Sequence, residues 1–581
     1  MYIRKSVQKN KNGRERVYLQ LAESYRIGNN VKQKNLCTLG RLDKLLEGSS
    51  LEHLIESISN VIREAKGKQF VDIENHLFVN DSFEYGFAYV ISQVWEKTGL
   101  RNILIEVFEK VKDRETAEKE VEAVFEMVLN RLTEPESKLQ AFNKWRKNYY
   151  LGEKWSSKDL EIEAKERAFT NKITETSHNT HEEGLRKEED IDSSSHFPLT
   201  LNDYYRAMDT LSETLEQIEE SLFFQRRNLF TDTELIFFDT TSTYFEGEGE
   251  EDSICKYGFS KDHRGDRKQV VISLVVDERR IPITHKVWEG NTVDKKAFSK
   301  TVKELKKRFG IRRAILVADR GCVSKDIIDS IEANGLEYIV GMRMNEVDVR
   351  EAVERAGRYS HIREDLYVKE VVLDNKQDRD STQPEDIKRY IVCYDPIEAQ
   401  YDRETREEAL SKLLKVKNVK TLIHNRVYKK LIVPNDTTFE INRDKIKELE
   451  KYDGKWVLLT NSSLPTEDVA MKYKELFKVE QSFRYMKSFL KIRPIYHYVE
   501  RRIKAHIGLV FLSLYSERVM ENICGSGWNF KRIGNALIPL KMVKMKANSQ
   551  TYLIRTDLKE ETKLFMRLLH IQMPKRVIKL T

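Results

Sequence analysis

The pattern of apolar and polar positions changes several times along the chain. Residues 1–46 alternate polar and apolar side chains between glycine-containing turns, which predicts a small basic β-meander. Residues 47–155 carry apolar side chains at helical spacing, as at Leu104 and Phe108, and predict a helical region that is also a candidate for DNA binding. Residues 156–196 have few apolar anchors, so we expect an acidic flexible linker there.

Short apolar runs and helix-period segments alternate through the middle of the chain. Their order is β-β-β-α-β-α-β, in which three meandering strands precede two strand–helix units. This order predicts an α/β fold with a mixed sheet covered by helices, and it matches the ribonuclease H-like fold. The strands are expected at 235–239, 269–276, 281–288, 315–319 and 337–341, and the helices at 294–309 and 325–334.

The rest of the chain is expected to complete this core or to extend it. Residues 197–344 would form the first part of the ribonuclease H-like core, and 454–515 the second part, with one long helix over about 466–489. Residues 345–453 mix strand and helix patterns and predict an inserted α+β domain. Residues 516–581 are expected to form a basic helical region.

Charge is distributed unevenly. The 581 residues include 34% charged side chains, yet the net charge is only +7. Residues 1–46 carry 11 Lys/Arg against three Asp/Glu, and residues 541–581 carry 10 against three. Such basic ends suit the phosphate backbone of DNA, although the net charge alone does not require a nucleic-acid partner.

Other features exclude several classes of protein. The five cysteines include no CxxC pair, which argues against a cysteine zinc site and against a disulfide scaffold. The start has no apolar signal segment, and the longest apolar stretch near the end, 507–515, is about half of a bilayer span. We therefore expect a cytoplasmic, nucleoid-associated protein with no membrane partner.

Two of the expected core strands end in an aspartate, Asp239 and Asp319. If these strands are neighbours, both carboxylates emerge at one edge of the sheet and repel each other unless a cation lies between them. Two Mg²⁺ ions, with Mn²⁺ as an alternative, need such ligands and a third carboxylate. Glu480, on the expected long helix, is our candidate for the third. The three would be catalytic through the metals, which activate a water or a 3′-OH.

Aromatic and basic side chains accompany Glu480 on the same expected helix. Tyr473, Glu480 and Lys487 are spaced seven residues apart, close to two helical turns, so one helix face would carry all three. Arg484 follows Glu480 by one turn. We expect Tyr473, Arg484 and Lys487 to contact DNA phosphates. The less favoured alternatives are a helix salt bridge between Glu480 and Arg484 and a solvated side chain for Lys487.

Three further basic residues are candidates for DNA contact. Arg320 directly follows Asp319, and Lys261 and Arg264 belong to the charged loop 261–269. Arginine and lysine near a cut site would neutralise phosphates. An ordinary charged surface loop remains the alternative for 261–269.

Asp239, Asp319 and Glu480 resemble the D-D-E triad of insertion-sequence transposases. The spacing 473, 476, 480 and 487 resembles the Y-R-E-K signature of the insertion-sequence-four superfamily, which is Y, two residues, R, three residues, E, six residues, K. The segments FFDTTSTYFE, YGFSKDHRGDRKQ and VADRG also look like that superfamily, and the resemblance covers roughly 200–515. The signature Arg position is Leu476 here, which puts the phosphate contact of that residue in question.

The resemblance implies a ribonuclease H-like catalytic domain with a strand-rich insertion between Asp319 and Glu480. It also implies Mg²⁺-dependent cut-and-paste transposition, in which a homodimer binds terminal inverted repeats and target DNA. Two alternatives stay open. One is a nuclease of the same fold that cleaves DNA without strand transfer, and the other is a catalytically inactive DNA-binding regulator of transposition.

Overall fold

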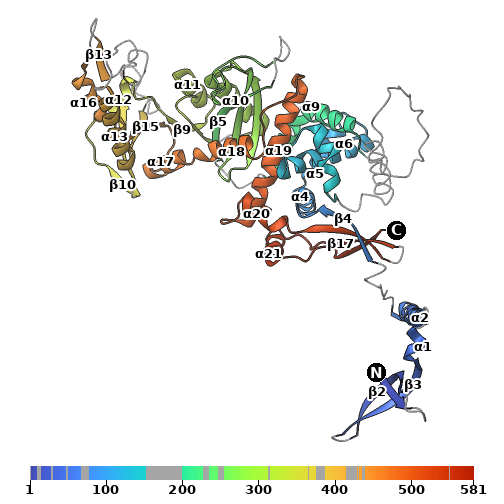
Figure 1. Ribbon diagram of the computed structural model, residues 1–581. Coiled ribbons are helices and arrows are strands. Elements are labelled where there is room, and N and C mark those ends of the chain that lie inside the picture. Colours follow the sequence, from blue (N-terminus) through green and yellow to red (C-terminus); the bar gives the residue numbers. More distant parts are fainter. Residues whose placement is uncertain are drawn as a thin grey trace. The chain divides into compact units, whose positions relative to one another are not determined.

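Figure 1 shows the computed structural model of the protein with its helices and strands labelled. The chain divides into two compact units, one made of Met1–Asp81, Val543–Ile554 and Val577–Thr581, and the other of Ser82–Met542 and Arg555–Arg576. The residues that the structure describes are 2–9, 15–27, 30–46, 50–66, 77–151, 199–226, 234–246, 254–311, 314–363, 365–374, 387–413, 428, 431–434, 439–547 and 550–580.

The smaller unit begins with three antiparallel strands in the order β1-β2-β3. Tyr2 lies opposite Ala22 in this pairing. Alternation of side chains along β2 puts Gln20 and Ala22 on the same, buried face, where Arg4 Nε donates to Gln20 Oε1 at 3.3 Å. The expected β-meander is confirmed. It comprises β1 (Tyr2–Lys9), β2 (Glu15–Ile27) and β3 (Asn30–Arg41), and helices α1 (Leu42–Leu46) and α2 (Ser50–Lys66) follow it.

A four-stranded sheet joins segments from distant parts of the chain in the order β18-β17-β16-β4. It corrects the expectation that residues 516–581 are helical. Val543, Met545 and Ala547 alternate with two lysines, and a period of two favours a strand. Strand β4 also places a strand within the expected helical region 47–155. The elements are β4 (Leu77–Glu84), α20 (Phe530–Leu537), β16 (Lys541–Ala547), β17 (Gln550–Arg555), α21 (Glu560–Leu568) and β18 (Val577–Leu580).

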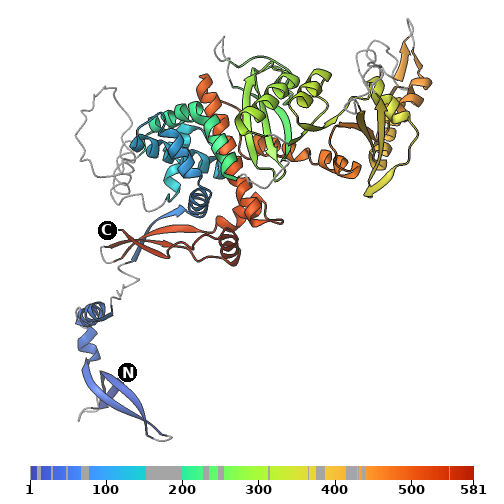
Figure 2. The ribbon, with the colours of Figure 1, turned by 180° about the vertical axis from the view of Figure 1, so that it is seen from behind.

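The larger unit contains a nine-stranded sheet in the order β10-β11-β12-β15-β9-β8-β5-β6-β7, which Figure 2 shows from behind. Strand β5 pairs in parallel with β8 and antiparallel with β6, and β8 pairs in parallel with β9. This is the mixed sheet expected from the sequence, and the ribonuclease H-like α/β fold is confirmed. Its first strands are β5 (Glu234–Tyr244), β6 (Gln269–Asp277), β7 (Pro282–Glu289), β8 (Ala314–Ala318) and β9 (Glu337–Gly341).

Helices cover both faces of this sheet (Figure 1). On one face, Phe238 of β5 shares a hydrophobic core with helices α10 (Asp294–Phe309) and α11 (Lys325–Ala333). Side chains alternate along a strand, so the neighbouring Phe237 points to the opposite face. There Lys478 Nζ, from helix α18, lies 5.7 Å from the centre of the Phe237 ring. The side chains of β5 therefore alternate between the hydrophobic core on the Phe238 face and the packing surface of α18 on the Phe237 face.

Three strands of residues 345–453 extend the same sheet, and two further strands of this segment, β13 and β14, form a separate two-stranded sheet. Strand β15 pairs antiparallel with both β9 and β12, and β11 and β10 follow outward. The expected inserted domain is thus continuous with the central sheet. Its elements are α12 (Val347–Glu354), β10 (Ser360–Arg363), β11 (Leu366–Asp374), β12 (Ile387–Tyr394), α13 (Pro396–Leu413), β13 (Ile432–Pro434), β14 (Phe439–Ile441) and α16 (Arg443–Glu450), and β15 (Lys455–Thr460) returns to the core.

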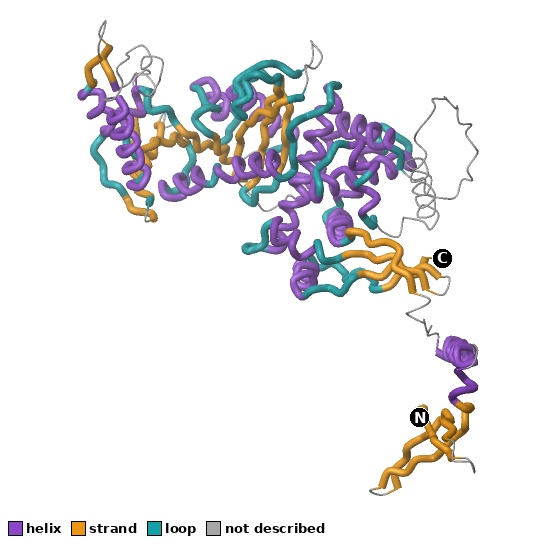
Figure 3. The backbone as a smooth tube through the Cα atoms, in the orientation of Figure 1, coloured by secondary structure: helices purple, strands orange, loops and turns teal. Residues whose placement is uncertain are grey.

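The remaining helices of the larger unit form a cluster with α19 (Glu500–Cys524), and Figure 3 distinguishes them from the strands. Every residue from Ala505 to Glu521 is buried, including the charged side chains of Glu517, Arg518 and Glu521. No helix among the described residues is long and apolar enough to cross a membrane. The expected linker 156–196 lies outside the described residues. The helices are α4 (Gly86–Lys97), α5 (Leu100–Phe108), α6 (Arg114–Thr133), α7 (Lys138–Asn143), the 3-10 helix η1 (Trp145–Asn148) and α9 (Leu201–Arg226).

The long helix expected over 466–489 is broken into two, α17 (Thr466–Lys474) and α18 (Phe477–Ser488). At the break, the Leu476 amide donates to the Tyr473 carbonyl at 2.9 Å, and the Val479 amide donates to the Leu476 carbonyl at 3.0 Å. These bonds span three residues instead of four, so the helix tightens and turns there. Leu476 is buried at the turn. No Pro or Gly marks this position, which is why the sequence predicted one helix.

Candidate active site

The two aspartates of the expected site lie on neighbouring strands. Phe238 of β5 pairs with Ala318 of β8, so the next residues along the chain, Asp239 and Asp319, follow side by side. Asp319 directly follows β8, whereas β5 continues beyond Asp239 to Tyr244. The expectation that β5 ends at Asp239 is therefore wrong, because the following Thr-Thr-Ser-Thr-Tyr segment is rich in residues that favour strands. The expected meeting of the two aspartates at one part of the sheet does occur.

Asp239 is half-buried in a mainly acidic environment. Burial raises the pKa of its carboxyl group to about 6. Lys261 and the Thr240 amide oppose this rise, and the carboxylates of Asp294 and Glu480 add to it. Glu480 thus lies near enough for its charge to act on Asp239, in agreement with the packing of α18 against β5 and β6. The third expected carboxylate therefore belongs to the same neighbourhood.

The ammonium group of Lys261 lies among these carboxylates. Its Nζ is 4.0 Å from Asp239 Oδ1 and 3.3 Å from Asp294 Oδ2. It also donates to the carbonyl oxygen of Thr240 at 2.8 Å and to the Thr240 hydroxyl at 2.6 Å. The backbone of Lys261 is fixed as well, because its amide donates to Ser242 Oγ at 2.9 Å. Lys261, one of the residues expected to contact DNA, is directed toward Asp239 and Asp294 in the structure.

Asp294 is a fourth carboxylate that the sequence analysis missed. It begins α10, and the Thr240 hydroxyl donates a hydrogen bond to it. A methyl group added at Gly321 would lie 3.8 Å from both Asp294 Oδ2 and Asp319 Oδ2, so these two side chains approach the same point. The only signal was the turn Gly-Asn-Thr-Val before Asp294, which indicated the start of a helix and nothing more.

Tyr473 contacts Asp319 from the end of α17. Its hydroxyl donates to Asp319 Oδ1 at 3.3 Å. Gly341 of β9 makes room for this contact, because a Cβ atom there would collide with the Tyr473 hydroxyl. Burial and the nearby Asp319 charge raise the pKa of Tyr473, which keeps the phenol protonated as a donor. Arg320 is exposed beside Asp319.

Lys487 and Arg264 are both paired with acidic residues. Lys487 Nζ lies 2.7 Å from Asp262 Oδ1, and Arg493 also pairs with Asp262. Because Asp262 follows Lys261 in the chain, this pairing ties α18 to the loop that supplies Lys261. Arg264 forms a two-bond contact with Asp266, with both distances at 2.9 Å.

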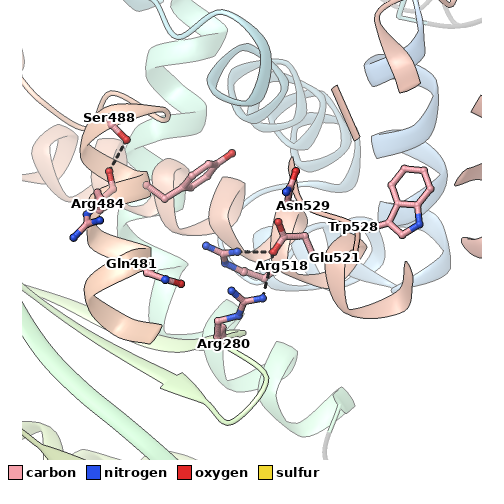
Figure 4. Close-up of a pocket in the computed structure, with 9 residues that line it drawn as sticks. Arg280, Gln481, Arg484, Ser488, Arg518, Glu521, Trp528 and Asn529 are labelled. Carbon is pink, nitrogen blue, oxygen red and sulfur yellow. Dashed lines mark hydrogen bonds and ion pairs between the residues drawn. The ribbon is translucent and has the colours of Figure 1, made fainter. Parts of the chain in front are cut away.

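Arg484 is exposed and lines a cavity on the flank of α18, which Figure 4 shows. It is one of the six residues expected to contact DNA. The break between α17 and α18 means that Tyr473, Glu480 and Lys487 do not share one continuous helix. Tyr473 nevertheless reaches Asp319 while Glu480 acts on Asp239, so two helices supply what one helix was expected to supply.

The donor chemistry of this site suits a divalent cation. Carboxylate oxygens are the ligands that Mg²⁺ prefers, and Asp239, Asp319 and Glu480 provide them. Across the described ranges, however, no three Asp, Glu, His or Cys side chains converge closely enough to hold one ion together. The cationic group that the chain itself places beside Asp239 is the Lys261 ammonium. A metal bound by Asp239 would share or replace that charge.

Two family models match the chain. Residues 3–68 match the IS1634 family transposase N-terminal domain, and residues 231–515 match the transposase DDE domain. The second match includes β5, which carries Asp239, and β8, which Asp319 directly follows. It also includes α18, which carries Glu480. Comparison with curated proteins gave no match.

Three solved structures resemble the chain loosely. The piggyBac transposase synaptic complex with hairpin DNA is 11% identical, with 78% of this chain and 79% of that chain covered and a TM-score of 0.35. The Mos1 transposase paired-end complex with left transposon end is 10% identical, with 37% and 57% covered and a TM-score of 0.13. A pre-cleavage Mos1 transpososome is 12% identical, with 42% and 77% covered and a TM-score of 0.13.

The identification rests on the two family matches and on the topology of the central sheet. The catalytic domain match covers the sheet, the insertion and α18, and the N-terminal match covers the β-meander with α1 and α2. The chain is a DNA transposase of the insertion-sequence DDE type, an enzyme of DNA cleavage and strand transfer.

Proposed function

We propose that Asp239, Asp319 and Glu480 are the catalytic carboxylates of this transposase and that together they hold two Mg²⁺ ions, with Mn²⁺ as an alternative. Transposase DDE domains generally depend on divalent metal ions. The observation that carries the proposal is the register of β5 and β8, which puts the two aspartates side by side while the Glu480 charge acts on Asp239. Bound ions of this kind activate an attacking water or 3′-OH and stabilise the leaving oxygen.

The other side chains of the site would position these carboxylates. The Tyr473 hydroxyl restrains Asp319 by its hydrogen bond to Oδ1. Lys261 neutralises part of the negative charge beside Asp239. The Lys487–Asp262 ion pair holds α18 against the loop of Lys261, so Glu480 keeps its place next to β5. Each of these contacts fixes an acidic oxygen without taking part in proton transfer.

Six residues are proposed to contact DNA: Tyr473, Arg484, Lys487, Arg320, Lys261 and Arg264. Arg320 and Arg484 are exposed, so they can meet a phosphate directly. Lys261, Lys487 and Arg264 are paired with carboxylates, and a phosphate would have to share or take over those ion pairs. Arginine and lysine release counterions when they neutralise phosphates, which supplies most of the non-specific affinity.

We further assign the chain to the insertion-sequence-four superfamily. Tyr473, Glu480 and Lys487 support this assignment by their spacing and by their contacts around the aspartates. Leu476 departs from the Y-R-E-K signature, and its side chain is buried at the break between α17 and α18. Arg484, one turn after Glu480, is the residue that we propose in place of the signature arginine.

The proposed substrates are the terminal inverted repeats of the element and a target duplex, held by a homodimer. The basic residues of 1–46 and 541–581 support binding of the DNA backbone. The proposed place of action is the cytoplasm, on the nucleoid.

A cleavage and joining assay tests the proposal. The full chain would be incubated with Mg²⁺ and a labelled DNA fragment that carries both ends of the element. We expect cut ends and joined products from the wild type and from the exposed-carboxylate control Asp329→Asn, and neither product from Asp239→Asn, Asp319→Asn or Glu480→Gln. Activity of Glu480→Gln would contradict the choice of glutamate.

The same assay separates the two alternatives. Cut ends without joined product would indicate a nuclease. DNA binding without any cutting by the wild type would indicate a regulator.

A further inference from the structure

A small cavity opens on the flank of α18, the helix that carries Glu480. Its volume is about 290 Å³, and its walls come from α18, from α19, from the turn between β6 and β7, and from the residues before α20. Gln481, which immediately follows Glu480, lines it. Figure 4 shows Arg280, Gln481 and Arg518 pointing toward the same space, and Arg484 is a further lining residue. One wall of the cavity is therefore formed by Gln481, the residue next to Glu480 in α18.

Two buried donors that line the cavity lack an acceptor. The Arg518 side chain is 6% exposed, and its Nη1 donates to Glu521 Oε2 at 2.5 Å. Its Nε has no partner among the described residues, and neither does the hydroxyl of Tyr485. A buried donor without an acceptor destabilises the folded protein. A ligand with several acceptor oxygens in the cavity would supply an acceptor to the Arg518 guanidinium.

The charge around the cavity also favours an anion. Arg280, Arg484 and Arg518 supply three positive charges, and Glu521 faces them with one negative charge. The second nearby acid, Glu517, is buried, and burial raises the pKa of its carboxyl group, which favours the uncharged form. The surplus is therefore positive. Arginine is suited to a phosphate group, because its planar donors match the phosphate oxygens in pairs.

Arg280 is held toward this space by an unusual backbone. Its φ angle is 66°, a left-handed conformation in which glycine or asparagine is far more common. The turn is fixed by Asp277 Oδ1, which accepts from the amides of Arg279 and Ile281, both at 2.9 Å. The turn geometry alone would favour Gly at 280. The backbone therefore gives no reason for an arginine at 280, and any advantage comes from the side chain. Its Nη2 lies 3.8 Å from Glu521 Oε2 at the cavity.

We propose that this cavity binds a phosphate group, and that in the working transposase the phosphate belongs to the backbone of the DNA strand beside the scissile bond. Arg280, Arg518 and Gln481 would donate to it, and Arg484 would close the rim. This inference rests on the proposed function of Glu480, which lies on the same helix. The proposed phosphate contacts would then lie on two sides of α18, the side of Glu480 and the side of the cavity.

The test uses Arg280→Gln, with Arg279→Gln as the matched control, in the full chain. Arg279 is the exposed neighbour in the same turn and does not line the cavity. Equilibrium binding of a fluorescein-labelled DNA duplex would be measured over a range of salt concentrations. Loss of one phosphate contact lowers the slope of log K against log salt by about 0.9. We expect that decrease in Arg280→Gln and an unchanged slope in Arg279→Gln, with equal melting temperatures for both variants.

A second arm distinguishes the source of the phosphate. Inorganic phosphate would be titrated into wild type, Arg280→Gln and Arg279→Gln while the melting temperature is recorded. Stabilisation that only Arg280→Gln loses, together with unchanged salt slopes, would support the phosphate site and overturn its assignment to DNA. Equal behaviour of both variants in both arms would overturn the inference, and wild-type cleavage in the same preparation would show that the proposed function survives.

Discussion

The two sides of the candidate active site are held in different ways. On the sheet side, Asp239 and Asp319 are placed by the register of β5 and β8, which many backbone hydrogen bonds maintain together. On the helix side, Glu480 lies on α18. This helix begins after the break at Leu476, and single contacts such as the Lys487–Asp262 ion pair hold it in place. Substitution of any of the three carboxylates should therefore abolish activity, whereas substitution of the contacts that hold α17 and α18 should lower it in steps.

The largest expected effect compares the two sides directly. Asp319→Asn should lower the rate of end cleavage on the order of 10³-fold, because it removes a charge from the proposed metal ligands. Tyr473→Phe should lower the rate by only about tenfold, since its hydroxyl restrains Asp319 without replacing it. Single-turnover cleavage with equal amounts of folded protein measures both. Similar losses in the two variants would show that the Tyr473 contact is as important for cleavage as the Asp319 charge itself.

The second prediction concerns the break between α17 and α18. Leu476→Arg would restore the signature arginine, but position 476 is 7% exposed, so the charge would be buried. We expect the free energy of unfolding to fall by about 3 kcal/mol. Leu476→Met, which conserves volume, should cost less than about 1.5 kcal/mol. Urea unfolding measures both variants. A stable Leu476→Arg protein with tighter DNA binding would mean that the turn can present an arginine to DNA.

The third prediction uses pH to weaken the helix side. His497, in the segment after α18, is surrounded by basic groups. Burial lowers the pKa of His497 to about 4, and Lys138 and Arg131 lower it further. The pKa of the buried His506 shifts in the same direction. Because the unfolded chain binds a proton near pH 6.5 and the folded chain only near 4, stability is lost as the pH falls through this window.

The expected size follows from that window. His497 should make unfolding easier by at most about 2 kcal/mol between pH 7 and pH 5, since the side chain is partly exposed. Urea midpoints at several pH values measure the effect, and His497→Gln should remove this part of the pH dependence. An identical pH profile in His497→Gln would show that His497 is not held neutral in the folded protein.

The smallest expected effect returns to the sheet side. Lys261→Met removes the ammonium group that lies 4.0 Å from Asp239 Oδ1. The affinity of the DNA-free protein for Mn²⁺ should then rise by about tenfold, because the ion no longer competes with that charge. Isothermal titration measures it, with the exposed Lys296→Met as the control. A lower affinity in Lys261→Met would mean that Lys261 helps to build the metal site.

The sequence predicted the sheet side better than the helix side, for physical reasons. Strand order and apolar runs follow from a period of two, and parallel neighbours bring Asp239 and Asp319 together without further information. The break at Leu476 has no Pro or Gly, so it depends on tertiary packing that a helical period does not reveal. Asp294 was missed because its role depends on Thr240 and Lys261, which are distant in the sequence.

The C-terminal strands show a different cause of error. In the sequence, Val543, Met545 and Ala547 alternate with lysines, which indicates a strand. The many lysines of this region outweighed that pattern and favoured a basic helix. The charged residues expected to bind DNA were identified by type only. Whether each lies on a carboxylate, as Lys487 does, or at an open surface, as Arg320 does, depends on the folded chain.

The central claim is that Asp239, Asp319 and Glu480 hold the same metal ions, and Fe²⁺-directed cleavage of the protein backbone tests it most directly. Fe²⁺ would replace Mg²⁺ in the full chain bound to end DNA, and ascorbate with peroxide would start local cleavage, with the fragments mapped by mass spectrometry. We predict cuts next to all three residues, each suppressed by excess Mg²⁺. Cuts at Asp239 and Asp319 with none near Glu480 would contradict the account.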